Sequence, residues 1–203
     1  MVDVHQVLTL LDELMSKTGA SATRATCIEQ CGLFREVLRR LDIPVREIVT
    51  RVIFHVPGRQ HACLLGFSDA ERRAAKAQHA APMNGGERGF QGHLVLIVAG
   101  QFLFDPSLCQ VKYADGSYIM RREFIVLDTK APILRKFPTF ELHLTAQLDD
   151  GNSAEIIWTR KNNDGYKKSR AWEMDKTTQE VAGLLEREIR SRLAGARREG
   201  RDA

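Results

Sequence analysis

The sequence lacks the features that mark several large classes of protein. No apolar run approaches the roughly 20 residues that a membrane-spanning helix needs. The N-terminus has no basic segment followed by an apolar one, which is the layout of a secretory signal. Phosphate-binding and dinucleotide-binding glycine motifs are missing, as are internal repeats and low-complexity segments. These absences argue against a membrane protein, a secreted protein and the common nucleotide-binding proteins.

Cysteine is scarce, with four in 203 residues. A chain of this length can bury a substantial core without covalent cross-links, so four cysteines do not indicate a disulfide framework. We therefore expect a reducing, cytoplasmic setting. No two cysteines have the close Cys-x-x-Cys spacing of common zinc sites. We expect neither a metal nor a cofactor.

The positive charge is concentrated at one end of the chain. Between Arg187 and Arg201 there are six arginines and two glutamates, a surplus that equals the whole net charge of +4. A basic tail is most often a solvated end, so nucleic acid or an acidic partner is a secondary candidate for this segment only. We expect no membrane partner; the oligomeric state is not indicated.

The segment from Cys27 to Arg46 organises the chain. Its apolar residues recur at helical spacing: Leu33, Phe34, Val37, Leu38 and Leu41. Pro44 ends this helix. Cys27 then lies at the first turn, where unpaired N–H groups and the helix dipole favour a thiolate, the nucleophilic form. Cys31 lies one turn inside and is interpreted as a packing residue.

The rest of the chain alternates between helical and strand patterns. We expect helices at 3–17 and from a capping box at Thr177-x-x-Glu180 onward, the latter with Val181, Leu184, Leu185, Ile189 and Leu193 on one side. Strands are expected at 46–56, 61–67, 93–98, 102–105, 119–127, 140–148, 154–160 and 166–174. Asp-Gly pairs join the last three into an antiparallel meander. The segment 68–92 starts as a short helix, continues as a loop and is a candidate flap over a site.

Three residues form a candidate nucleophile, base and orienting group: Cys27, His93 and Asp105. His93 opens one strand and Asp105 closes the next, so the two can meet only if their side chains share a face. A two-residue loop would pair Asp105 with Leu96, on the opposite face. A three-residue loop, 99–101, pairs Asp105 with Val95 and makes it a diagonal neighbour of His93. We predict the three-residue loop.

These motifs resemble a known family. Cys27 followed at a distance by Ile43-Pro44-Val45-Arg46, then Gly92-His93 and an apolar run, then Phe104-Asp105-Pro106-Ser107, are similar to the three core motifs of the transglutaminase-like superfamily. Asp42 stands where that family usually has glycine. The resemblance covers about residues 20–112 and implies Cys27 as nucleophile, His93 as base and Asp105 as orienting residue.

The resemblance implies an α+β protein with a papain-like core, in which N-terminal helices pack on an antiparallel sheet. We place this core at 1–138, including the 68–92 insert. The β-meander and basic terminal helix occupy 139–203 and pack on the core. The Cys27 backbone N–H would be the first oxyanion donor. Gln91 is a weak candidate for the second, by proximity to His93 alone.

The expected activity is acyl transfer through a Cys27 thioester on peptide, isopeptide or glutamine amide bonds. We therefore expect a protein or peptide substrate. Water as acceptor gives a peptidase or deamidase, which we favour because water is always available. An amine acceptor gives a transglutaminase, and an acetyl-carrier transferase is a weaker option. A non-catalytic binding module of the same fold is the alternative from another class.

Overall fold

The computed structural model describes residues 3–18, 27–59, 61–76, 92–108, 111, 125–130, 139–148, 150–162, 164–169 and 172–199. Its helices are α1 (Val4–Thr18), α2 (Cys27–Arg40), α3 (Asp69–Lys76) and α5 (Lys176–Glu199), with short 3₁₀ helices η1 (Pro57–Arg59) and η3 (Gly165–Lys168). Its strands are β1 (Val45–Val56), β2 (His61–Leu65), β3 (His93–Val98), β4 (Phe102–Asp105), β5 (Ile125–Asp128), β6 (Glu141–Gln147) and β7 (Ser153–Arg160).

The strands form one antiparallel sheet centred on the long strand β1. The order is β5-β4-β3-β1-β7-β6, and β2 also pairs with β1. One edge of β1 pairs first with β3, over 45–50, and then with β2, over 52–56. The other edge pairs with β7 over 50–55. The mixture of helices and antiparallel strands confirms the predicted α+β class.

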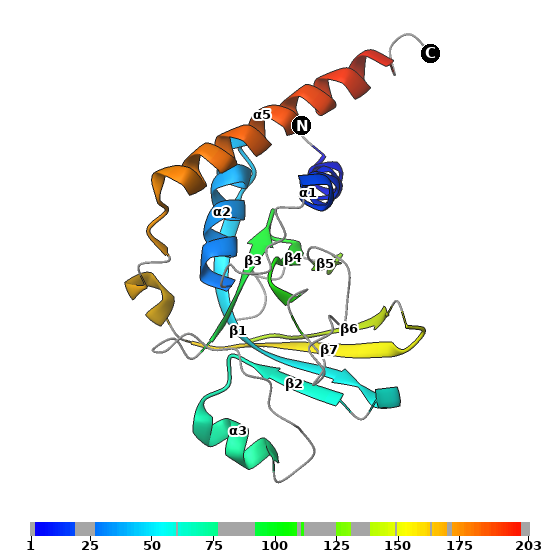
Figure 1. The fold of residues 1–203 in the computed structure, drawn as a ribbon, viewed down its shortest axis with the longest axis vertical. Helices are drawn as coiled ribbons and strands as arrows, with labels where there is room; N and C mark the ends of the chain where they lie inside the picture. Colours follow the sequence, from blue (N-terminus) through cyan, green and yellow to red (C-terminus); the bar gives the residue numbers. More distant parts are fainter. Residues whose placement is uncertain are drawn as a thin grey trace.

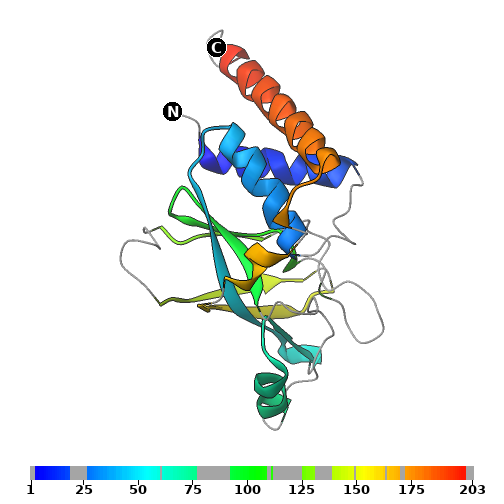
Figure 2. The ribbon, with the colours of Figure 1, turned by 90° about the vertical axis from the view of Figure 1, so that its left-hand side faces the viewer.

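Helices α1, α2 and α5 lie on one side of this sheet, and α5 packs on α1 and α2. Figures 1 and 2 show α1, α2 and α5 together on one side, whereas α3 lies at the opposite end of the molecule. A first apolar cluster fills the space between those helices and the sheet, and includes Phe34, Leu96 and Ile189. A second cluster, which includes Leu103 and Trp158, consists of residues from the strands and their connections. All six residues of β3 are buried because both faces of the sheet are covered.

The end of α2 explains how the chain turns from this helix into β1. The Ile43 N–H donates to the Leu38 carbonyl, and the Asp42 N–H to the Arg39 carbonyl, a Schellman arrangement. This arrangement needs a left-handed residue after the helix, and Asp42 supplies it at φ 58°. The glycine that Asp42 replaces in the resembled motif would adopt this conformation without strain.

The predicted meander is partly wrong. β6 and β7 form the expected hairpin, but β7 also pairs with β1, so both belong to the main sheet. The third predicted strand, 166–174, is not a strand: 165–168 form η3, and 172–175 are not extended in a ladder. Tyr166 is buried there, edge-on to Trp172 at 4.9 Å between ring centroids. Burying this aromatic pair in the first cluster competes with continuing the sheet.

The start and the apolar side of the terminal helix also differ from expectation. Asp175, not Thr177, caps α5, because its carboxylate accepts from the Thr178 N–H at 2.7 Å. Val181 and Leu184 are exposed, whereas Leu185 and Ile189 are buried together with Ala182. The buried stripe is therefore rotated from the predicted one toward α1 and α2.

Two arginines of the basic terminal segment are engaged within the molecule. Arg190 pairs with Glu186 at 2.7 Å, and Arg192 pairs with Glu188 at 2.8 Å. Arg192 also reaches Glu13 on α1 at 3.3 Å. These ion pairs neutralise part of the positive charge for which the tail was considered a candidate nucleic-acid-binding segment.

No helix among the described residues is long and apolar enough to cross a membrane. The division into a core at 1–138 and a C-terminal part at 139–203 stays a prediction.

Candidate active site

The loop between β3 and β4 has the predicted length. Val98 pairs with Phe102 and Leu96 with Phe104, so 99–101 form the loop. Ala99 and Gly100 adopt left-handed conformations there, at φ 51° and 71°. This register brings His93 and Asp105 to one face, and His93 Nε2 lies 2.8 Å from Asp105 Oδ2. Both side chains are buried.

The Asp105 carboxylate is held by several donors. Oδ2 accepts from the Trp158 indole N–H at 2.8 Å, in addition to His93. Oδ1 accepts from the backbone N–H groups of Ser107 and Leu108, each at 3.2 Å. Burial by itself raises the pKa of Asp105, but the charge of His93 and these hydrogen bonds outweigh it and lower the pKa. Asp105 is therefore ionised and fixed in orientation.

Cys27 is the first residue of α2 and is partly buried against the first apolar cluster. Its thiol interacts with the His93 ring closely enough to contribute to the raised pKa of His93. Because Nε2 faces Asp105, the other ring nitrogen, Nδ1, is the one left for the sulfur. The first-turn N–H groups of a helix have no acceptor within the helix, and the Cys27 N–H is one of them.

His93 carries a positive charge at neutral pH. Burial lowers its pKa, whereas the charge of Asp105 and the hydrogen bonds to Asp105 and Cys27 raise it, to about 10. The arrangement thus places a buried imidazolium between a carboxylate and a sulfur. The Cys27 sulfur thus has positive charge on this side and the positive end of the α2 dipole on the other.

The other described thiols lie in apolar surroundings. Cys31 is buried and donates its S–H to the Leu94 carbonyl at 3.2 Å. Burial, followed by the nearby charges of Cys27 and Asp105, raises the pKa of Cys31 well above its ordinary value. Its interpretation as a packing residue agrees with this burial. Cys63 is buried in the second cluster. Cys109 and the weak oxyanion candidate Gln91 lie outside the described residues.

Trp158 is the main site residue that sequence reasoning missed. It lies on β7 and is fully buried, and its indole reaches Asp105 from a different part of the chain. The available signal was a tryptophan inside a predicted buried strand, since a buried indole N–H usually has an acceptor. Identifying that acceptor requires the β1–β7 pairing, which no local pattern contains.

Thr50 and Gly66 enclose the backbone of His93. Thr50 pairs with His93 across β1 and β3, and its hydroxyl donates to the His93 carbonyl at 3.1 Å. Gly66 is left-handed at φ 75°, and a Cβ there would lie 2.5 Å from the Thr50 carbonyl oxygen and 2.7 Å from the His93 nitrogen. The close contact between these backbones requires glycine at position 66.

The helix that begins the 68–92 insert is tied to the sheet. Ser68 and Glu71 form a reciprocal capping box at the start of α3, with distances of 2.6 and 3.2 Å. Glu71 also pairs with Arg51 and, at 3.5 Å, with Lys161. The predicted surface helix is confirmed; the loop that follows it lies outside the described residues.

Within the described part of the chain, no group of three or more His, Cys, Asp or Glu side chains is arranged to hold a metal ion. The arrangement at Cys27 needs none for nucleophilic attack by a thiol. Comparisons with protein-family models, with curated proteins and with solved structures find no match to this chain.

Proposed function

We propose that this protein is a cysteine-dependent acyl-transfer enzyme that attacks peptide, isopeptide or glutamine amide bonds through a thioester on Cys27. One observation carries the proposal: Cys27, the first residue of α2, interacts with His93, whose Nε2 is held 2.8 Å from a buried carboxylate oxygen of Asp105. Nucleophile, base and orienting group in this order constitute the general arrangement for covalent acyl transfer. A papain-like, transglutaminase-like core belongs to the same proposal.

The reaction divides into two steps. The Cys27 sulfur attacks the amide carbon, the C–N bond breaks, and the amine leaves with the proton from His93. A water molecule then gives a proton to His93 and attacks the thioester, the C–S bond breaks, and a carboxylic acid and the free thiolate are released. Asp105 keeps the ring oriented and stabilises its cation throughout, and the Cys27 N–H stabilises the oxyanion of each step.

We favour water as the acceptor, which makes the enzyme a peptidase or deamidase. An amine in place of water would yield a new amide bond and a transglutaminase. The difference lies in whether the site excludes water, and the residues that would decide it belong to the 68–92 insert. A glutamine peptide incubated with and without a primary amine separates the outcomes: hydrolysis releases acid product in both samples, whereas transfer yields the amine adduct.

Thiol labelling tests the proposal directly. The protein is incubated with iodoacetamide at neutral pH, and labelled cysteines are mapped by mass spectrometry over time. We expect Cys27 to react fastest, ahead of Cys31 and Cys63, because only Cys27 combines partial exposure with a cationic neighbour. In the His93→Ala variant this selectivity should disappear.

The His143→Ala variant is the matched control, since His143 is an exposed histidine on β6 paired with Glu141. Its labelling pattern should equal that of the wild type. Labelling of Cys27 no faster than Cys63 would contradict the enzyme and leave the binding-module alternative. A screen of casein, isopeptide-linked conjugates and glutamine peptides then identifies the substrate.

A further inference from the structure

A second concave site lies beside β1, where β7 turns away from it. This cavity has a volume of about 220 Å³ and is lined by residues 46–49 of β1 and by Arg160, Lys161, Asn162, Asp164, Tyr166 and Lys167. Four of these side chains are cationic and two are acidic. The site therefore has a surplus of positive charge, and a cleft lined by charge of one sign concentrates ions of the opposite sign.

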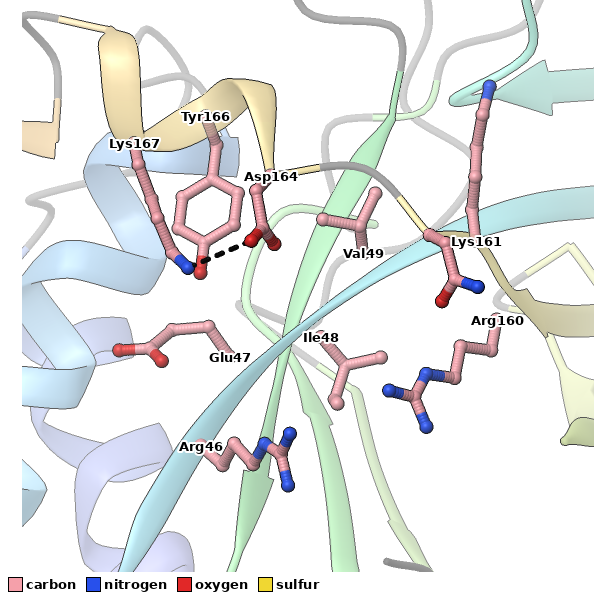
Figure 3. Close-up of a pocket in the computed structure, with 10 residues that line it drawn as sticks. Arg46, Glu47, Ile48, Val49, Arg160, Lys161, Asp164, Tyr166 and Lys167 are labelled. Carbon is pink, nitrogen blue, oxygen red and sulfur yellow. Dashed lines mark hydrogen bonds and ion pairs between the residues drawn. The ribbon is translucent and has the colours of Figure 1, made fainter. Parts of the chain in front are cut away.

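Both carboxylates of the cavity are already neutralised by other groups. Glu47 pairs with Arg35 at 3.0 Å, and Arg35 is fixed by stacking on the Trp172 ring, 4.0 Å from its centroid. Asp164 pairs with Lys167 at 3.1 Å, the contact drawn as a dashed line in Figure 3. Neither carboxylate is left to balance the remaining cations.

Lys161 is committed elsewhere as well. Its ammonium group donates to the Gly66 carbonyl at 3.1 Å and lies 3.5 Å from Glu71. In Figure 3 its side chain points away from the two arginines of the cavity. Lys161 thus stabilises the start of the 68–92 insert and does not contribute to the surplus charge.

Arg46 and Arg160 remain, and neither has an ion pair with any residue that the structure describes. Figure 3 shows their guanidinium groups pointing toward one another on either side of Ile48. Two like charges that converge without a counter-ion repel each other. Guanidinium groups bind carboxylate and phosphate oxygens in pairs of parallel hydrogen bonds, so an oxyanion between them would remove that repulsion.

We propose that this cavity binds an oxyanion, a carboxylate or a phosphate, between Arg46 and Arg160. The strand register relates it to the candidate active site. Thr50 pairs with Arg160 on one edge of β1 and with His93 on the other, so the three residues form one row on one face of the sheet. Adjacent strands are about 4.8 Å apart, which places the Arg160 and His93 backbones roughly 10 Å from each other.

Thr50, between Arg160 and His93, is fully buried, so the cavity and the candidate triad are separate sites on the two edges of β1. Binding of the anion itself does not depend on the thiol chemistry.

Binding is measured on the Cys27→Ser variant, which lacks the nucleophile, so that loss of anion binding and loss of thiol reactivity are observed separately. The arginine side-chain N–H signals are followed by NMR during titration with N-acetylglutamate and, in a second series, with inorganic phosphate. Chloride keeps the ionic strength constant. We expect saturable shifts, and the tighter probe identifies the source as a carboxylate or a phosphate.

Adding Arg46→Gln or Arg160→Gln should raise the Kd roughly tenfold or more, the effect of losing one charge-assisted pair of hydrogen bonds. Arg160→Lys keeps the charge but not the planar fork and should give an intermediate Kd. Lys168→Gln is the matched control: it removes an exposed cation of η3 that does not line the cavity, and should leave the Kd unchanged. Non-saturable shifts with both probes, or the same Kd in the glutamine variants as in the Lys168→Gln control, overturn the proposal.

Discussion

At the scale of single residues, the candidate site depends on how completely one carboxylate is satisfied. Asp105 accepts hydrogen bonds on both oxygens, from a ring, an indole and two backbone groups. A buried carboxylate with fewer donors would have a higher pKa and would hold the His93 cation less firmly. Each donor therefore acts on Cys27 indirectly: it stabilises the Asp105 carboxylate, and Asp105 in turn holds His93.

Trp158 allows this dependence to be tested without emptying the core. Trp158→Phe keeps an aromatic ring but removes the N–H donated to Asp105 Oδ2. We expect a loss of about 1.5–3 kcal/mol in the free energy of unfolding, the usual worth of a hydrogen bond to a charged group. We also expect slower alkylation of Cys27, measured with iodoacetamide and mass spectrometry.

Trp172→Phe is the control for that measurement, because Trp172 contacts Arg35 and Tyr166 instead of Asp105. It should leave the Cys27 rate unchanged. Equal rates in Trp158→Phe and wild type would mean that Trp158 is a packing residue without a positioning role.

At the scale of elements, the turn at Asp42 determines the direction in which the chain leaves α2 and enters the central strand β1. Asp42 holds a left-handed conformation that costs a non-glycine residue roughly 1 kcal/mol. Its side chain gains little in return, since its contact with Arg190 at 3.9 Å is between exposed groups. The turn is thus kept by its backbone hydrogen bonds rather than by its side chain.

Asp42→Gly should therefore stabilise the protein. We expect an increase of about 0.5–1 kcal/mol in the free energy of unfolding, measured by urea titration, because glycine adopts this conformation freely. Asp42→Asn, which tolerates the same conformation but removes the charge, should change stability by less. A lower stability in Asp42→Gly would show that the carboxylate, not the backbone, holds the turn.

Local patterns predicted the elements whose partners lie nearby in the chain. The helical stripe of α2, the buried strand β3 and the three-residue loop before β4 follow from periodicity and from the requirement that His93 and Asp105 share a face. The failures occurred where distant packing decides. The 166–174 segment reads as a strand, but Tyr166 is buried beside Trp172 instead, and the buried side of α5 depends on where α1 and α2 lie.

At the scale of the whole molecule, the sheet joins parts of the chain that the predicted division at 138/139 separates. β7 pairs with β1 over residues 50–55. Trp158, which follows the division in sequence, donates a hydrogen bond to Asp105, which precedes it. The two apolar clusters lie on opposite faces of the same sheet, so strands β1, β3 and β4 contribute to both. A structure of this kind is expected to unfold as one cooperative unit.

The two tryptophans report separately on the two clusters, since Trp158 belongs to the second and Trp172 packs against the first. In Trp172→Phe the fluorescence follows Trp158, and in Trp158→Phe it follows Trp172. For each variant, we expect the fluorescence and circular dichroism transitions in urea to have the same midpoint. Separate midpoints within one variant would show two independently stable parts.

The pairing of β1 with β7 also has a consequence for the order in which the site is completed during folding. The β3–β4 hairpin closes over a three-residue loop, so His93 and Asp105 can meet early and locally. The Trp158 donor arrives only when a strand from the last quarter of the chain finds β1, and such long-range closure is slow. A ribosome-bound chain that ends before β7 would hold the nucleophile, base and carboxylate but not the finished hydrogen-bond network, so synthesis of the C-terminal strands completes the site.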